Sequence, residues 1–232
     1  IPCVVGIHGL MEEANFGDEI LVDGYKGHVY LNPGQETLER YGRLESEQRQ
    51  IQEKFQNELH EPCVTLDANE YKVLVNVEGF EGRARLTGSG AVGVGLFRTE
   101  NLFLSSHDFP DEEQQYEVYR GIVESLAPHP VTIRTLDLGG DKNPHRSLTG
   151  YHEANPFMGF RGIRFCLEHP DIFKNQLKAI LRASHHGPVK VLYPMISSLG
   201  EMVRANALFD EARQELLDRE IPISDHILRG AM

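Results

Sequence analysis

Short apolar runs alternate with amphipathic helical patterns after Pro62, and this alternation restricts the possible folds more than any other feature of the chain. The runs lack clean apolar–polar alternation, as expected for strands that are buried on both faces of a parallel sheet. Strands are predicted at residues 72–77, 92–97, 131–136, 189–193 and 226–232, with helices at residues 111–126, 170–184 and 199–219. Such regular units indicate an α/β fold, the first half of a (β/α)8 barrel of the TIM type, because these strands are too few to close an eight-stranded barrel.

The first 62 residues follow a different pattern. Residues 1–33 carry short strand patterns at residues 3–5, 19–22 and 28–31, punctuated by glycines, and are interpreted as the end of a small domain. Residues 34–62 are rich in Glu, Gln and Arg, with apolar residues at spacings of three, four and seven, which predicts one long amphipathic helix. We interpret it as a linker to the barrel domain at residues 63–232; a partner-recruiting coiled coil is the alternative, but it would need more heptads.

Composition excludes several classes of function. The chain has 23 Lys and Arg against 35 Asp and Glu, and its net charge of −12 without a basic run argues against nucleic-acid binding. No apolar run approaches the roughly 18 residues of a membrane span, and no signal-peptide pattern is present, so a cytoplasmic protein is expected. The three cysteines are widely spaced and are expected to be reduced, buried thiols. Because the chain begins and ends within a pattern, it is interpreted as a piece of a longer protein.

Two predicted strands end in arginine, which points to an anion site. Arg134 closes the run at residues 131–136, a Gly-Gly turn then leads to Lys142, and Arg98 follows the run at residues 92–97. Ligand sites of parallel barrels lie at the carboxyl ends of the strands, and planar guanidinium groups bind phosphate bidentately. Arg161, near a predicted helix start, is a third candidate. The alternative for each arginine is an ordinary salt bridge at the surface or between domains.

Five ordered motifs make a family resemblance specific. Their order and spacing resemble enzyme I of the phosphoenolpyruvate-dependent phosphotransferase system along essentially all 232 residues. The motifs are Gly95-Leu-Phe-Arg98-Thr-Glu100, Arg134-Thr-Leu-Asp137-Leu-Gly-Gly-Asp-Lys142, Asn155-Pro-Phe-Met-Gly-Phe-Arg161-Gly-Ile-Arg164, Gln176-Leu-Lys-Ala-Ile-Leu-Arg-Ala-Ser184 and Leu192-Tyr-Pro-Met195. Residues 1–6 and 31–33 resemble the end of that family's swivelling phosphohistidine domain.

The resemblance implies phosphoryl transfer from phosphoenolpyruvate to an enzyme histidine and on to a histidine-containing phosphocarrier protein. The positions that match the family's substrate contacts are Arg98, Arg134, Arg161 and Lys142, and Asn76 borders the same pocket. Fixed cations suit a loose, metaphosphate-like transition state, whose charge is spread over the phosphoryl oxygens. The resemblance also implies a homodimer for the complete protein.

The remaining catalytic groups are expected outside this chain. The resemblance places the phosphohistidine upstream of Ile1 and the ligands of a bridging Mg²⁺ after Met232, so the fragment is expected to be inactive alone. His8 is flanked by glycine and is interpreted as a loop residue, with a phosphoryl acceptor as the alternative.

Two other families of function stay open at this point. A pyruvate phosphate dikinase or phosphoenolpyruvate synthase shares the barrel and the swivelling domain, but the Gly-Gly-Asp-Lys turn at residues 139–142 favours enzyme I or its nitrogen-related paralogue. A catalytically silent dimerisation or regulatory module is disfavoured because both strand-end arginines are present. The sequence departs from the family pattern at Phe160, where tryptophan is common, at Glu78, where a small residue is usual, and at residues 143–146, which are unusually polar.

Overall fold

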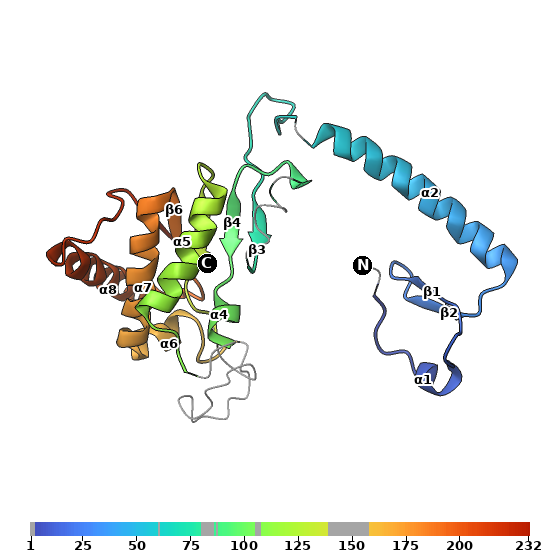
Figure 1. Ribbon diagram of the computed structural model, residues 1–232, viewed down its shortest axis with the longest axis horizontal. Coiled ribbons are helices and arrows are strands. Elements are labelled where there is room, and N and C mark those ends of the chain that lie inside the picture. Colours follow the sequence, from blue (N-terminus) through green and yellow to red (C-terminus); the bar gives the residue numbers. More distant parts are fainter. Residues whose placement is uncertain (1–2, 60, 80–85, 87, 105–107, 139–157) are drawn as a thin grey trace. The chain divides into compact units, whose positions relative to one another are not determined.

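The chain divides into two units, Ile1–His60 and Glu61–Met232, and each is described by itself (Figure 1). The structure is a computed structural model that describes residues 3–59, 61–79, 86, 88–104, 108–138 and 158–232. None of the described helices is both long and apolar enough to cross a membrane.

A five-stranded parallel sheet forms the centre of the C-terminal unit. Its order is β3-β4-β5-β6-β7, with bounds β3 Val75–Val77, β4 Val94–Phe97, β5 Val131–Arg134, β6 Val189–Tyr193 and β7 Leu228–Ala231. Strands that follow one another in the chain are also neighbours in the sheet, as in successive βα units of a barrel. The predicted α/β fold is confirmed: the sheet is consistent with part of an α/β barrel, and no closed barrel is formed by the described residues.

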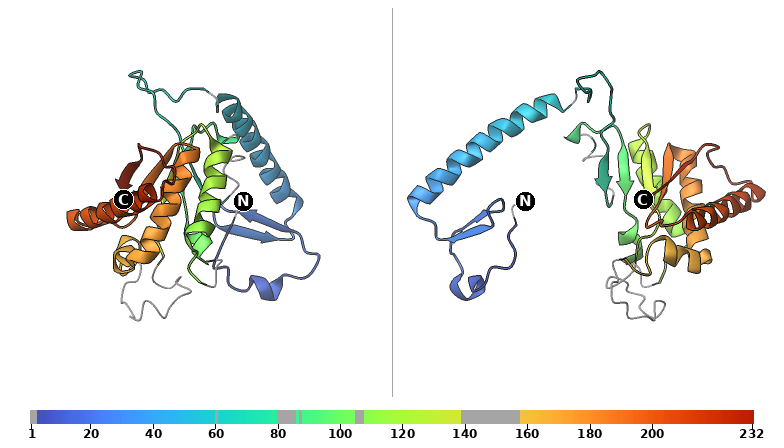
Figure 2. Two further views of the ribbon diagram at one scale, coloured as in Figure 1. Left: turned by 60° about the vertical axis from the view of Figure 1, so that its left-hand side comes forward. Right: turned by 180° about the vertical axis from the view of Figure 1, so that it is seen from behind.

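Three long helices pack on one face of this sheet (Figure 1, Figure 2). They are α5 Glu112–Leu126, α7 Pro170–Ala183 and α8 Leu199–Asp218, close to the predicted bounds. Asp111 and Ser198 start α5 and α8 with reciprocal capping boxes, in which the side chain accepts a hydrogen bond from the backbone N–H three residues later. The core lies between the sheet and these helices, where Phe97 meets Tyr119 of α5 and Tyr193 meets Phe173 of α7.

Several short elements differ from the sequence-based predictions. Helices α4 Glu100–Leu104 and α6 Ile163–Glu168, and the 3-10 turn η3 Ser184–His186, were not predicted as separate elements, because three to six residues are too few to show helical periodicity. The strand predicted at residues 3–5 is wrong: these residues are irregular, and a short helix, α1 Leu10–Glu13, follows them. A run of three residues stays extended only when it pairs with a neighbouring strand. The sheet in the described part of this unit consists of β1 and β2, and residues 3–5 do not pair with it.

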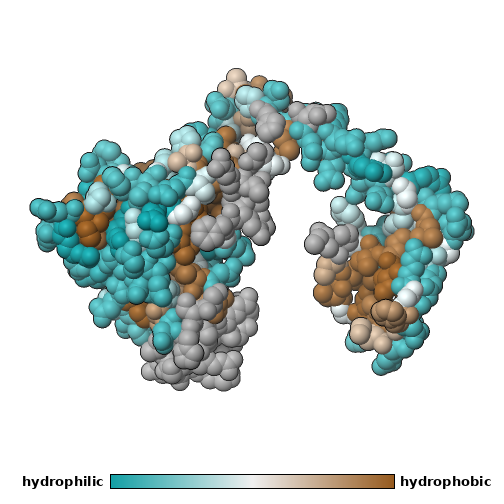
Figure 3. Space-filling model, in the orientation of Figure 1, coloured by the Kyte–Doolittle hydropathy of each residue, from teal (hydrophilic) through white to brown (hydrophobic). Residues whose placement is uncertain are grey.

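The N-terminal unit consists of a hairpin and a long helix. Strands β1 Ile20–Asp23 and β2 His28–Leu31 pair in antiparallel fashion, and α2 Gln35–Glu58 follows as predicted. Tyr41 of α2 donates a hydrogen bond of 2.7 Å to Asp23 Oδ2, and Asp23 is the only residue classed as buried among those described in this unit. Apolar side chains gather over α1 and the hairpin (Figure 3). Large exposed members are Val5, Met11, Phe16, Ile20 and Val22.

Candidate anion site at the carboxyl edge of the sheet

Arg98 and Arg134 lie at the same edge of the parallel sheet. Arg98 directly follows β4, and Arg134 is the last residue of the neighbouring strand β5. Successive strand side chains point to opposite faces. The buried neighbours Phe97 and Ile133 face the helix layer, so both arginines belong to the opposite face, which is the interior side of a barrel. The structure therefore brings the two predicted arginines together at one rim.

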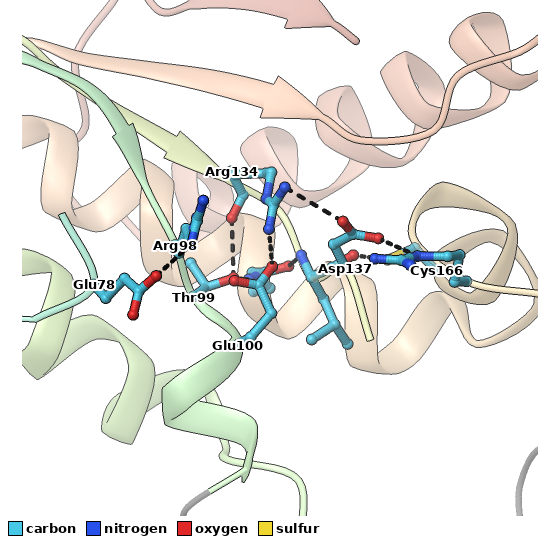
Figure 4. Close-up of polar contacts among 10 residues, drawn as sticks. Glu78, Arg98, Thr99, Glu100, Arg134, Asp137 and Cys166 are labelled. Atoms are coloured by element: carbon cyan, nitrogen blue, oxygen red, sulfur yellow. Dashed lines mark hydrogen bonds and ion pairs between the residues drawn. The ribbon is translucent and has the colours of Figure 1, made fainter. Parts of the chain in front are cut away.

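Arg134 is held between two carboxylates. Its Nη2 lies 2.8 Å from Glu100 Oε1, and its Nη1 lies 3.3 Å from Asp137 Oδ2 (Figure 4). The side chains of Arg134 and Glu100 are only 14% and 15% exposed. In this partly desolvated setting, opposite charges interact more strongly than in water, so the guanidinium group has little freedom to move. Its Nε is buried and has no hydrogen-bond partner among the described residues.

Arg98 has a looser environment. Its Nη1 pairs with Glu78 Oε1, and the two side chains are 47% and 54% exposed. Exposed ion pairs of this kind contribute about 0–1 kcal/mol, so a ligand could recruit Arg98 at small cost. Glu78 is the residue that departs from the expected small side chain, and the structure explains what it does: it neutralises the exposed arginine.

Asp137 joins the third arginine to the cluster. Arg161 Nε lies 2.9 Å from Asp137 Oδ1, while the other oxygen of the same carboxylate faces Arg134. Gly162, the N-cap of α6, has φ +57°, and a Cβ at this position would lie 3.2 Å from Asp137 Oδ1 and 2.9 Å from the Met195 side chain. Only glycine allows the chain to pass this close to Asp137 without strain. The loop before α6 is thereby kept against the strand-end cluster.

The other predicted contacts are less defined. Asn76 lies on β3 with its side chain exposed, and it is in register with Leu96 on the same face as Arg98. Lys142 lies outside the described residues. His8 is exposed in the N-terminal unit. The geometry is compatible with both interpretations of the arginines. Each arginine has a carboxylate partner, as in an ordinary salt bridge, and all three lie at one edge of the sheet, as in an anion site.

Sequence reasoning did not assign the partners of the arginines. Glu100 and Asp137 belong to the motifs that were recognised, but their pairing depends on which strands are neighbours. Gln176 of α7 was also missed; it bonds to Thr99 and Leu136, which lie just beyond β4 and β5. A glutamine in the middle of the apolar stripe of residues 170–184 was the available signal.

The cysteines differ partly from expectation. Cys166 is buried in α6, and its Sγ lies 3.8 Å from the Leu136 carbonyl oxygen. Burial raises the pKa of the Cys166 thiol well above its ordinary value, so it stays protonated near neutral pH. The prediction of buried thiols is wrong for Cys3 and Cys63, which are exposed, because the irregular segments around them pack on no core.

The described residues do not form a metal centre. No group of three or more His, Cys, Asp or Glu side chains in this part of the chain is arranged to hold a metal ion. The carboxylates at the sheet edge, Glu78, Glu100 and Asp137, are each engaged by an arginine. They therefore do not fit a Mg²⁺ site, which needs free carboxylate oxygens.

The cluster can bind an oxyanion without carrying a large net charge. Three guanidinium groups face three carboxylates, which hold Arg134 and Arg161 in place and leave Arg98 in a weaker, exposed pair. The unpartnered Nε of Arg134 is the exception. A buried N–H without an acceptor costs about 1–3 kcal/mol, and an anion that reaches this edge would remove that cost.

Comparisons with known proteins show the family of the chain. A family model described as "PEP-utilising enzyme, PEP-binding domain" matches residues 52–232. The chain is similar to phosphoenolpyruvate-protein phosphotransferases of Geobacillus stearothermophilus, at 37% identity over 233 residues, and of Cupriavidus necator, at 39% over 234 residues. Each alignment covers 100% of this chain and 40% of the relative. The relative from Mycoplasma pneumoniae is 39% identical over 223 residues, which cover 93% of this chain and 38% of that protein.

Proposed function

The chain belongs to the PEP-utilising enzyme family, and we propose that its C-terminal unit supplies the phosphoryl-binding edge of an enzyme that transfers phosphate from phosphoenolpyruvate to a protein. The chain spans about two fifths of the length of the relatives named above, so the activity belongs to the whole protein. The names of those relatives favour a protein acceptor over the pyruvate phosphate dikinase and phosphoenolpyruvate synthase alternatives.

The buried, unpartnered Nε of Arg134 is the observation that carries the proposal. Arg134 is fixed by Glu100 and Asp137 and would meet the phosphoryl oxygens with a preformed donor. Arg98 would exchange its exposed partner Glu78 for a second phosphoryl oxygen. Donors that are already in place stabilise charge developing in the transition state without reorganisation, which is where electrostatic catalysis gains most.

The other residues have supporting roles in the proposal. Arg161 would lie beside the phosphoryl group, because Asp137 binds both Arg161 and Arg134. Lys142 and Asn76 would provide the remaining contacts. The accepting histidine belongs to a swivelling domain that includes residues 1–33. The scarcity of buried residues in the N-terminal unit and its exposed apolar side chains support the view that this segment packs into a larger domain.

The proposal extends to partners and setting. The phosphoryl group passes from the enzyme histidine to a histidine-containing phosphocarrier protein, in the cytoplasm, in an enzyme that forms a homodimer. Mg²⁺ would be held by carboxylates other than the arginine-paired ones described above. When bound, it would neutralise charge on the phosphate and carboxylate of phosphoenolpyruvate.

Arg98→Ala in the full-length protein tests the proposal. Loss of one positioned donor lowers kcat for phosphoryl transfer about 10²–10³-fold by analogy with other preorganised sites, while the exposed Arg98–Glu78 pair contributes too little for its loss to unfold the protein. The assay follows pyruvate release and phosphorylation of the carrier protein. Arg120→Ala is the matched control, because Arg120 is also an exposed arginine paired with a glutamate, Glu117 of α5. Equal rates for the two variants would refute a phosphoryl site at this edge.

A further inference from the structure

Gln176 connects the ends of two strands from behind the sheet. It lies on α7 with 1% of its surface exposed. Its Nε2 donates to Thr99 Oγ1 at 3.3 Å and to the Tyr119 hydroxyl oxygen at 3.1 Å. Its Oε1 accepts a hydrogen bond of 2.8 Å from the Leu136 backbone N–H. Both ends of the amide are therefore engaged, and two of its three partners lie just beyond β4 and β5.

Those two partners are next to the arginine cluster. Thr99 stands between Arg98 and Glu100, and its hydroxyl donates a hydrogen bond of 3.0 Å to the Arg134 carbonyl oxygen (Figure 4). Leu136 directly precedes Asp137, the carboxylate shared by two arginines. One side-chain amide thus bonds the Thr99 side chain after β4 and the Leu136 backbone after β5.

We propose that Gln176 is a positioning residue for the phosphoryl site, which holds the ends of β4 and β5 at the spacing that lets Arg98 and Arg134 bind one anion. This inference rests on the proposed function. Gln176 lies behind the sheet and acts only through Thr99 and Leu136, whose neighbours make the proposed contacts.

The network around Gln176 is complete, which distinguishes it from incidental burial of a polar side chain. The Tyr119 hydroxyl donates a hydrogen bond of 3.1 Å to Gln115 Oε1, and Gln115 Nε2 donates to the Pro110 carbonyl oxygen at 2.8 Å. Burying an amide is costly unless its groups are paired, and an apolar residue would fill the same space without that requirement. A fully satisfied network instead specifies one arrangement of the elements that it joins.

The register of β4 gives this connection a specific task. The pairing of β4 with β5 shifts between Val94 and Phe97, so only one pair, Phe97 with Ile133, lies between this irregularity and the two arginines. The bonds from Gln176 and Thr99 lie just past that irregularity. They add to the Phe97–Ile133 pair, which directly precedes the two arginines, and connect the segments that follow it.

Gln176→Met in the full-length protein tests the inference, because methionine keeps the length of the side chain and removes the hydrogen bonds. We expect kcat to fall about 10–100-fold with KM changed less than about threefold, since a misplacement near 1 Å costs roughly 10²-fold when it is felt in the transition state. Ser184→Ala is the control: Ser184 is buried just past the end of α7 and bonds the Leu181 carbonyl oxygen, far along the helix from Gln176. That variant should lose stability and keep kcat.

Two further measurements keep the test decisive. Thr99→Val, which is nearly isosteric, should reproduce the loss of kcat if Gln176→Met fails to fold. Amide hydrogen exchange at Leu136 should accelerate in Gln176→Met, and this readout needs no activity. Unchanged kcat in both variants would overturn the positioning role. If the wild-type protein transferred no phosphate, the proposed function itself would fail. Unchanged amide exchange at Leu136 in Gln176→Met would refute the link from Gln176 to the segment after β5, whatever the activity.

Discussion

Replacing Arg134 with methionine should expose the energetic cost of the carboxylates that surround it. Methionine keeps an unbranched apolar stem, so the change removes the guanidinium group with little loss of packing. It leaves Glu100, whose side chain is 15% exposed, with no cation among the described residues. Asp137 loses one partner but keeps Arg161 at 2.9 Å. The unpaired Glu100 therefore dominates the cost.

The magnitude follows from the burial of the pair. Breaking a buried ion pair by removing one partner costs about 3–5 kcal/mol, because the remaining charge stays desolvated. Adding Glu100→Gln removes that charge, and we expect the double variant to recover about 1–3 kcal/mol of the loss, the cost that one unsatisfied buried group imposes. By contrast, Arg98→Ala should change stability by at most about 1 kcal/mol, since its partner is exposed.

Urea unfolding of the chain, followed by far-ultraviolet circular dichroism, measures these differences from the midpoints at constant slope. The order of stability should be wild type, then Arg98→Ala, then the double variant, then Arg134→Met. A double variant no more stable than Arg134→Met would show that Glu100 is well solvated without its partner. The claim that Arg134 is held rigidly before a ligand arrives would then fail.

Two other results are expected. Gly162→Ala should destabilise the C-terminal unit by about 1–3 kcal/mol in thermal unfolding, because φ +57° and the Cβ contact with Asp137 are both unfavourable, whereas Gly200→Ala, with only Ser198 Oγ at 3.9 Å, should not. The pKa of Glu201 is lowered from its ordinary value of 4.5, mainly because its carboxylate accepts a hydrogen bond from the Ser197 backbone N–H. Hydrogen bonds from the Ser197 hydroxyl and from Ser198 lower it further. The ionised Glu201 carboxylate therefore stabilises the fold fully above pH 4.5, and this contribution is lost as the pH falls through the lowered pKa. In Glu201→Gln, stability against urea should decline less steeply below pH 4.5.

The five strands of the parallel sheet and the long helices were predictable from local pattern alone, whereas the strand predicted at residues 3–5 was wrong. Residues 189–193 are β6 as predicted, and α5 and α8 begin where Asp111 and Ser198 provide capping residues. These signals lie within a few residues of one another in the chain. The short helices α4 and α6 have six residues or fewer, which is too short to be stable alone. They are stabilised by packing around the buried Phe103 and Phe165, and such packing leaves no local pattern in the sequence.

The partners within the site could not be predicted in the same way. Arg98 and Glu78 are twenty residues apart, and Arg134 and Glu100 are thirty-four apart, so their contacts exist only once β3, β4 and β5 are neighbours. The register shift in β4 makes even the known strand order insufficient, because it changes which residue of β5 faces Arg98. What the sequence does carry is the residue types: three arginines at strand or helix ends, and a glutamine within an apolar helix face.

The contrast between the two strand-end arginines has a consequence for how an anion would be bound. Arg134 is almost immobile between Glu100 and Asp137, while Arg98 is exposed and tied only to Glu78. An incoming phosphoryl group would first meet the exposed Arg98, which would leave its surface partner Glu78, and the buried Nε of Arg134 would be the inner donor. Because the exposed Arg98–Glu78 pair is weak, this exchange would cost little, and the role proposed for Gln176 is to keep both arginines within reach of one anion.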